Sequence, residues 1–187
     1  MTQLLLVPSP PACGGRGLGW GGRMAGDVTI RELKPDDVET LAEVAVAAWR
    51  PVYEVRRALV GDEIYEAVWP DALAHKAAQI RRACEPEHAA HVRVAETGGK
   101  VAGFVTFYAD RRTGVGEIGN NAVHPDFQGR GIGRRMYAHV FDEMRAMGMR
   151  FVKVSTGGDD AHLPARRAYE NAGFDRALPT VTYYRKL

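Results

Sequence analysis

The sequence is poor in the residue patterns that would assign a chemistry directly. It has two cysteines among 187 residues, Cys13 and Cys84, which lie far apart and outside any metal-ligand spacing. The pair therefore gives neither a disulfide framework nor a zinc motif, and we expect no bound metal. So few cysteines predict a reducing, cytoplasmic setting. No apolar run approaches the roughly 20 residues of a membrane span, so no membrane partner is expected.

A strong charge imbalance is also missing. The formal net charge is +2, with 26% charged and 45% hydrophobic residues, which is ordinary for a globular protein. A balanced chain gives no electrostatic reason to bind nucleic acid, and none is expected as a partner. The length suits one domain with a sizeable core.

The first 23 residues do not have the composition of a folded segment. Pro8, Pro10 and Pro11 precede a glycine-rich run, 14–22, which cannot bury enough apolar surface to offset chain entropy. We expect a disordered extension over residues 1–25 and a folded domain over 26–187, with Met24 as an alternative start. A GxGxxG match at 17–22 carries no weight, because proline precedes it and no helix follows.

Patterned sequence after this extension predicts an α/β fold. Alternation of apolar and polar residues predicts strands, apolar residues at helical spacing predict helices, and Pro51 is expected to end the first helix. Antiparallel neighbours come first and crossover helices later, which implies a mixed sheet with helices on both faces. The expected strands are 28–33, 92–96, 101–108, 117–123, 151–155, 174–176 and 180–186, and the expected helices are 35–49, 53–69, 70–84, 131–147 and 161–171.

A glycine-rich turn joins the strand ending at Val123 to the long helix that follows. Glycines at 129, 131 and 133 allow positive φ and a close approach of the backbone to a ligand. The N–H groups that open a helix, and its dipole, favour an anion at that point. Arg130 and Arg134 add positive charge. The turn is therefore a candidate cradle for a pyrophosphate.

Two common phosphate motifs do not fit this turn. A P-loop needs Lys and Ser or Thr after its last glycine, where this chain has Arg134 and Arg135. A dinucleotide fingerprint that begins at Gly129 and Gly131 would need a third glycine at Arg134. A strand–helix connection that binds nothing is the remaining alternative.

The turn resembles the hallmark of the GCN5-related N-acetyltransferase (GNAT) family, Gln/Arg-x-x-Gly-x-Gly/Ala, at Gln128, Gly131 and Gly133. The approach Ala-Val-His-Pro-Asp-Phe-Gln is also typical of the family, and the resemblance covers about 28–187. It implies a mostly antiparallel sheet of six to seven strands, with the middle strands splayed. It further implies that acetyl-CoA binds with its pyrophosphate on the turn and its pantetheine arm on the end of the preceding strand. The implied cofactor-binding residues here are Ala122, Val123, His124, Gln128, Gly129, Arg130, Gly131, Ile132, Gly133 and Arg134.

A second stretch, Ala165 to Phe174, resembles the family signature Ala-x-x-x-Tyr-Glu-x-x-Gly-Phe. Spacing alone makes Tyr169 a core aromatic residue. The resemblance implies that it protonates the departing CoA thiolate, which leaves poorly without a proton. His162 stands where many members have Asn. It either contacts the pantetheine arm or caps the helix with nearby aspartates, and Arg166 is expected beside the cofactor.

Glu117 is the candidate catalytic base. The acceptor amine must lose a proton before it attacks the thioester, and Glu117 stands on the strand that leads to the turn. Strand alternation places it on one face with Gly119, Asn121 and Val123. Its spacing before Gln128 is similar to that of the glutamate in the family's histone-modifying branch. His124 is the alternative base, and Asn120 or Asn121 could hold substrate or a relay water.

These features together predict an N-acetyltransferase that moves an acetyl group from acetyl-CoA to a primary amine by direct attack. A small-molecule acceptor is favoured over a peptide, and a homodimer is possible. A noncatalytic acyl-CoA-binding module is the alternative function. Aromatic and acidic residues of the first two expected helices suit a cationic amine, although they equally suit an amphipathic helix: Trp49, Tyr53, Tyr65 and Trp69 with Glu54, Asp62, Glu63 and Glu66.

Overall fold

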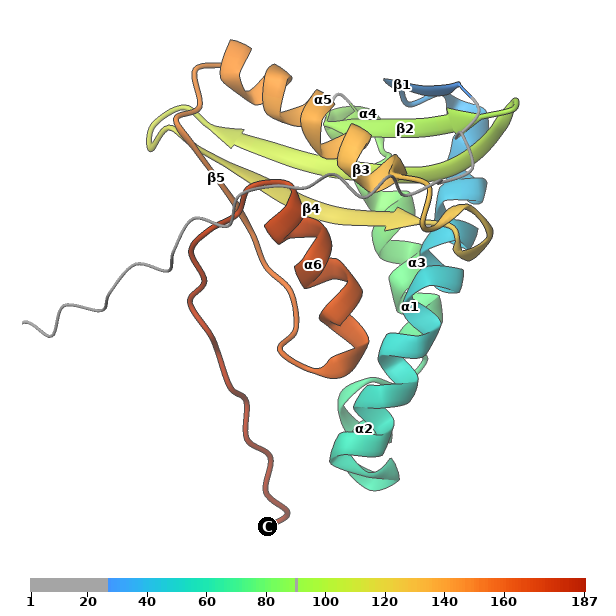
Figure 1. The fold of residues 1–187 in the computed structure, drawn as a ribbon. Coiled ribbons are helices and arrows are strands. Elements are labelled where there is room, and N and C mark those ends of the chain that lie inside the picture. The colour runs from blue at the N-terminus through green and yellow to red at the C-terminus, as the bar shows by residue number, and fades with distance from the viewer. Residues whose placement is uncertain (1–26, 90) are drawn as a thin grey trace, which may run out of the picture.

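A single mixed sheet organises the protein (Figure 1). The computed structural model describes residues 27–89 and 91–187, so the expected extension over 1–25 lies outside the described residues. The five strands lie in chain order across the sheet. They are β1 (Val28–Glu32), β2 (Val92–Thr97), β3 (Lys100–Asp110), β4 (Val115–Val123) and β5 (Phe151–Val154).

The first four strands are antiparallel, and the last pair is parallel. Gly98 and Gly99 have φ of 57° and 71° and form the predicted two-residue turn between β2 and β3. β5 pairs with β4 only as far as Ile118, although β4 continues to Val123. The two strands therefore part halfway along β4, and no strand among the described residues pairs with the second half of β4 on that side.

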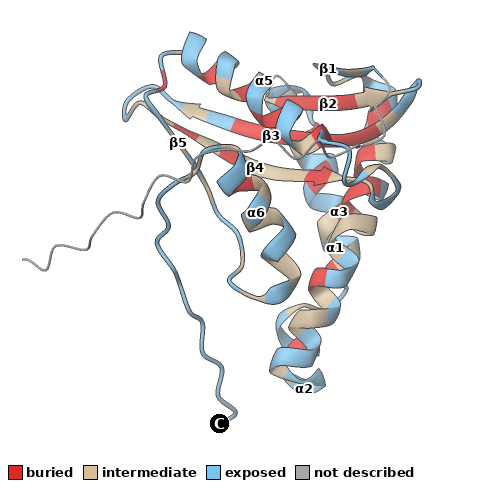
Figure 2. Cartoon of the chain, viewed as in Figure 1, coloured by how far each residue is buried: buried red, intermediate tan, exposed pale blue. Residues whose placement is uncertain are grey.

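Helices cover both faces of the sheet and create two apolar cores (Figure 2). One core lies under α5 and is centred on Phe107, Met136 and Val140. The other lies under α1 and α3, around Leu41 and Phe104. The helices are α1 (Val38–Val60), α2 (Asp62–Val68), α3 (Ala72–Ala83), α4 (Pro86–Ala89), α5 (Ile132–Ala146) and α6 (Leu163–Asn171), with 3-10 turns η1 (Pro35–Asp37), η2 (Pro125–Phe127) and η3 (Asp160–His162). No helix among the described residues is long and apolar enough to cross a membrane.

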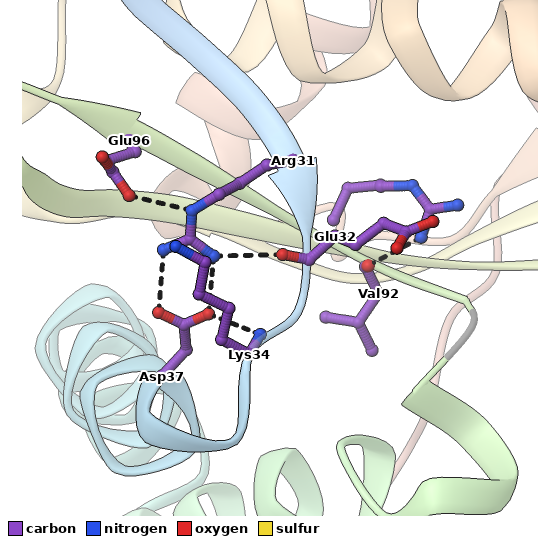
Figure 3. A network of polar contacts seen from close by, with 7 residues as sticks. Arg31, Glu32, Lys34, Asp37, Val92 and Glu96 are labelled. Atoms are coloured by element: carbon purple, nitrogen blue, oxygen red, sulfur yellow. Dashed lines mark hydrogen bonds and ion pairs between the residues drawn. The ribbon is translucent and has the colours of Figure 1, made fainter.

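The junction between β1 and the first helical turn is held by a polar network (Figure 3). The Arg31 guanidinium donates to both carboxylate oxygens of Asp37, at 2.7 and 2.9 Å, and to Glu96 of β2 at 2.8 Å. Asp37 also accepts a hydrogen bond from the Lys34 backbone N–H and is only 6% exposed. The paired guanidinium lowers the pKa of the Asp37 carboxyl. This network fixes where α1 starts relative to the sheet.

The expectation that Pro51 ends the first helix is wrong. α1 continues from Val38 to Val60 with Pro51 inside it. Proline in a helix removes one backbone hydrogen bond, but here Ala45 before Pro51 packs in the core under α1, and Val52 directly after Pro51 is also buried. Tertiary packing therefore outweighs the free-energy cost of the backbone hydrogen bond that Pro51 cannot form.

The predicted strands 174–176 and 180–186 are absent, so the sheet of residues 27–89 and 91–187 has five strands rather than six to seven. The chain after Asn171 contains no helix or strand and extends away from β5 (Figure 1). Phe174 still packs on Phe141 and Tyr169. The end of the tail instead contacts α2 and the residue after it: the Tyr184 ring lies 5.9 Å from that of Trp69, and Lys186 pairs with Glu63 at 2.7 Å. The alternating apolar residues of this tail, such as Val181 and Tyr183, are therefore mostly exposed.

Candidate active site

The turn after β4 is shaped by its own side chains. The His124 backbone N–H donates to Ala102 of β3 at 2.8 Å, and its ring Nδ1 accepts from the Asp126 backbone N–H at 3.3 Å. Gln128 Nε2 donates to the Val123 carbonyl at 3.0 Å, and Arg130 donates to the Asp126 carbonyl at 2.7 Å. Three predicted binding residues, His124, Gln128 and Arg130, thus stabilise the turn. One ring nitrogen of His124 is already engaged, which counts against its role as a base.

The start of α5 has the backbone geometry that the predicted cradle would require. Gly129 and Gly131 have φ of 73° and 74°, which other residues adopt only with strain. Gly131 is the N-cap of α5 and offers no side-chain cap, so the first N–H groups of the helix lack intrahelical acceptors. Ile132 is 2% exposed and anchors this turn in the core, so only its backbone faces the site. The exposed Arg134 adds charge beside this helix end.

The free edge of β4 presents backbone groups next to the cradle. Because the His124 N–H bonds to β3, the alternation of an antiparallel ladder turns the backbone of Ala122 toward β3 and that of Val123 away from it. Of Ala122, Val123 and His124, the strand end where the resemblance implies that pantetheine binds, Val123 is the residue whose backbone faces the open edge. Ala122 is 7% exposed and packs its side chain under α1 and α3.

A β-bulge in β4 overturns the predicted face of Glu117. Ile118 pairs with Phe107 and Asn121 pairs with Val105, so two β4 residues, 119 and 120, oppose Thr106 alone. The extra residue reverses the alternation. Glu117, which pairs with Tyr108, therefore shares a face with Gly119 but not with Asn121 and Val123 as the sequence predicted.

Asn121 joins two tyrosines on the α5 side of β4. Its Nδ2 donates to the Tyr169 hydroxyl at 3.1 Å and to the Gly119 carbonyl at 3.1 Å. Its Oδ1 accepts from the Tyr137 hydroxyl at 2.8 Å. Burial raises the pKa of both phenols, so each keeps its proton at neutral pH. Sequence reasoning missed Tyr137, whose only signal is its place one turn after Gly133 on the inner side of α5.

Glu117 lies on the other face, beside the point where β4 and β5 part. Its carboxylate pairs with Lys153 of β5 at 2.9 Å and is 40% exposed. The residue next in the chain, Ile118, forms the last pair between the two strands. A carboxylate at this place can take a proton from a group that approaches the open half of β4.

The loop before α6 determines what His162 and Arg166 do. The His162 ring lies 2.8 Å from the Asp159 carboxylate, and its backbone N–H donates to the same group at 3.3 Å. Arg166 donates to the carbonyls of Gly157 and Asp159 at 2.8 and 2.6 Å. The His162 side chain does not cap α6; the Asp159 carboxylate instead caps η3 by accepting from the His162 backbone N–H. A contact of His162 with the pantetheine arm stays a prediction. Arg166 orders the same loop.

Two curated relatives align with the chain. The N-alpha-acetyltransferase RimI of Mycobacterium tuberculosis is 29% identical over 160 residues, which cover 84% of this chain and 85% of the relative. The ribosomal protein bS18-alanine N-acetyltransferase of Salmonella typhimurium is 37% identical over 65 residues, 35% of this chain. That second alignment spans only 43% of the relative.

Solved structures share the architecture. The PaiA N-acetyltransferase of Thermoplasma acidophilum, solved with coenzyme A, superposes with a TM-score of 0.57 and 19% identity over 78% of this chain and 88% of that one. The model of the acetyltransferase (GNAT) family matches residues 55–174, which include β4, the cradle and α6. The chain therefore belongs to the acetyltransferase (GNAT) family.

Proposed function

We propose that the protein transfers an acetyl group from acetyl-CoA to a primary amine by direct attack in a ternary complex. The observation that carries this proposal is the uncapped start of α5, with two left-handed glycines, next to the open edge of β4. That arrangement fits a diphosphate beside an extended arm that can bond to a strand edge. The coenzyme A in the Thermoplasma acidophilum structure supports the same cosubstrate.

In this proposal, a base on one face of β4 and an acid on the other carry out the two proton transfers of the reaction. The nitrogen of the neutral acceptor amine forms a bond to the thioester carbonyl carbon, and Glu117, directly or through a water, takes one proton from that nitrogen as the bond forms. The backbone N–H of Val123, directed away from β3, stabilises the oxyanion. The carbon–sulfur bond breaks, and Tyr169 gives its proton to sulfur. Both residues then exchange protons with water to return to their starting states.

The acceptor in this proposal is a primary amine, either on a small molecule or at a peptide terminus. The two curated relatives are an N-alpha-acetyltransferase and an alanine N-acetyltransferase, which supports including peptide α-amines beside the small molecules favoured from sequence. The alternative, a noncatalytic acyl-CoA-binding module, would not need an acid and a base on either side of one strand edge.

Calorimetry and thiol release together test the proposal. We expect the purified protein to bind CoA and acetyl-CoA, and to release free thiol from acetyl-CoA with some members of a panel of small amines and N-terminally free peptides. Binding without thiol release across the panel would favour the noncatalytic module. A protein that binds neither CoA nor acetyl-CoA would refute the cradle and the roles built on it.

A further inference from the structure

The aromatic residues of α1 and α2 already contact cations of the protein itself. The Lys76 ammonium lies 4.4 Å from the centre of the Trp49 ring. The Arg56 guanidinium lies 5.6 Å from the Tyr53 ring and 5.5 Å from the Trp69 ring. A cationic amine would have to displace these groups to stack on the same rings. The arrangement thus argues against the cationic acceptor that the aromatic residues alone suggested.

Most of the acidic residues near these rings are also paired. Asp62 and Glu66 both bind Arg57, the first at 3.1 Å, and Glu63 binds Lys186 at 2.7 Å. In contrast, neither Lys76 nor Arg56 forms an ion pair with any carboxylate in the range 27–89 or 91–187. Lys76 and Arg56 therefore keep positive charges that no ion pair with a described carboxylate compensates.

Lys76 connects this charge to the centre of the sheet. It projects from α3 and donates hydrogen bonds to Asn120 of β4 at 3.1 Å and to Gln79 at 2.7 Å. Asn120 belongs to the β4 bulge, directly before Asn121, the partner of Tyr169. Its side chain faces α3 and so lies on the sheet face opposite Tyr169, the same face as Glu117.

The positive charges of Lys76 and Arg56 repel each other. Burial, and next the charge of Arg56, lower the pKa of Lys76 to about 8. A like charge disfavours the protonated amine, whereas a nearby anion favours it. A bound anionic group between Lys76 and Arg56 would compensate both charges.

We propose that Lys76 and Arg56 bind a carboxylate that the acceptor carries close to its reactive amine. This inference rests on the proposed function and narrows its substrate class. Lys76 reaches the bulge through Asn120, so an acceptor held there approaches β4 on the face of Glu117. Amines with a neighbouring carboxylate, whether the main-chain carboxylate of an amino acid or an acidic side chain in a peptide, fit this site. Polycationic amines do not.

Matched acceptors test the inference, with thiol release from acetyl-CoA as the readout. One pair is alanine and alaninamide, and the other is the C-terminally amidated dipeptides Ala-Asp and Ala-Asn. The two pairs separate a main-chain carboxylate from a side-chain carboxylate. We expect kcat/KM to favour the carboxylate of at least one pair by about tenfold or more, mainly through KM.

Charge-removing variants then assign the preference to the two cations. Lys76→Gln and Arg56→Gln are each expected to reduce the kcat/KM preference for the carboxylate acceptor to about twofold, with little change in kcat/KM for the neutral acceptors. Lys76→Arg, which keeps the charge, should retain most of the preference. Lys100→Gln removes an equal charge from the exposed β2–β3 turn and should leave the preference unchanged. Thermal unfolding of each variant shows whether it is folded.

Failure of this inference is distinct from failure of the proposed function. Two results would overturn the inference and leave the proposed acetyltransferase function standing. One is equal kcat/KM within both pairs of acceptors, and the other is a carboxylate preference that survives both Lys76→Gln and Arg56→Gln. If no amine is acetylated, the proposed function fails. Calorimetric titration of the four compounds into the CoA-loaded protein then tests the carboxylate site without turnover. Binding that favours the carboxylate compounds and loses this selectivity in Lys76→Gln supports the site. Equal binding of the matched compounds refutes it.

Discussion

Asn121 Nδ2 donates to the Tyr169 hydroxyl at 3.1 Å, although 48 residues separate the two in the chain. The bond joins β4 to α6 beside the part of β4 that β5 no longer accompanies. The same amide group donates to the carbonyl of Gly119 within the bulge. The bulge, the asparagine and the phenol are thus positioned as one unit, and the phenol is held neutral by burial.

Replacing Tyr169 by phenylalanine should separate chemistry from cosubstrate binding. The ring packs in the core, whereas the proton donor is lost, so we expect kcat to fall at least about tenfold while the Kd for CoA changes by less than about twofold. Steady-state thiol release and calorimetry measure the two effects. Tyr183→Phe, in the exposed tail, is the matched control. An unchanged kcat in Tyr169→Phe would remove the acid role.

Two glycines at opposite ends of α5 provide a controlled test of the cradle. Gly131 and Gly148 have φ of 74° and 86°, and an added Cβ would meet nothing within 4 Å at either position. Alanine at each site therefore brings similar backbone strain, of order 1 kcal/mol, without a steric clash. We expect Gly131→Ala to weaken CoA binding several-fold and Gly148→Ala to leave it unchanged. Comparable CoA affinities, measured by calorimetry, would place the cradle elsewhere.

Glu117→Gln tests the base. The substitution keeps the size of the side chain and removes its capacity to accept a proton, so kcat is expected to fall by about a hundredfold. The ion pair with Lys153 is largely exposed, and its loss should cost less than about 1 kcal/mol of stability. Glu32→Gln, on β1, makes the same change on an exposed strand residue and serves as the control. If both variants retain full turnover, Glu117 is not the base.

The features that sequence predicts well are those that depend on neighbouring residues. The Gly98–Gly99 hairpin and the left-handed Gly131 at the start of α5 follow from short spacings and from the conformations open to glycine. The meeting of Asn121 and Tyr169 depends instead on tertiary packing. The family resemblance placed Tyr169 near the chemistry but gave no reason to pair it with Asn121 or Tyr137.

Alternation could not predict the face of Glu117, because one bulge residue reverses the pattern within the strand. The cause lies across the sheet: an added Cβ at Gly119 would stand 2.5 Å from Thr106 Oγ1, so glycine there allows a close approach to β3. The role of Lys76 was missed for a similar reason. Only the packing of α3 on β4 brings it to Asn120.

The β1–α1 junction yields a stability prediction that is independent of catalysis. Asp37 is buried, and Arg31 holds its pKa below the usual value of 3.8. A carboxylate whose pKa is lower in the folded state stabilises the fold fully above its unfolded pKa, and this contribution disappears as the pH falls through the folded pKa. Asp37→Asn leaves a partly buried guanidinium whose one remaining charged partner among the described residues is Glu96. It should therefore cost about 2 to 4 kcal/mol at neutral pH.

The pH dependence of this loss distinguishes an ion pair from simple packing. Denaturant unfolding of the wild type and Asp37→Asn should show a constant difference between pH 6 and 8, which shrinks below about pH 4 as Asp37 of the folded wild type takes up its proton. Asp36→Asn, at the exposed neighbouring position, should behave like the wild type throughout. A difference that persists at low pH would mean that the shape of the side chain, rather than its charge, holds the junction.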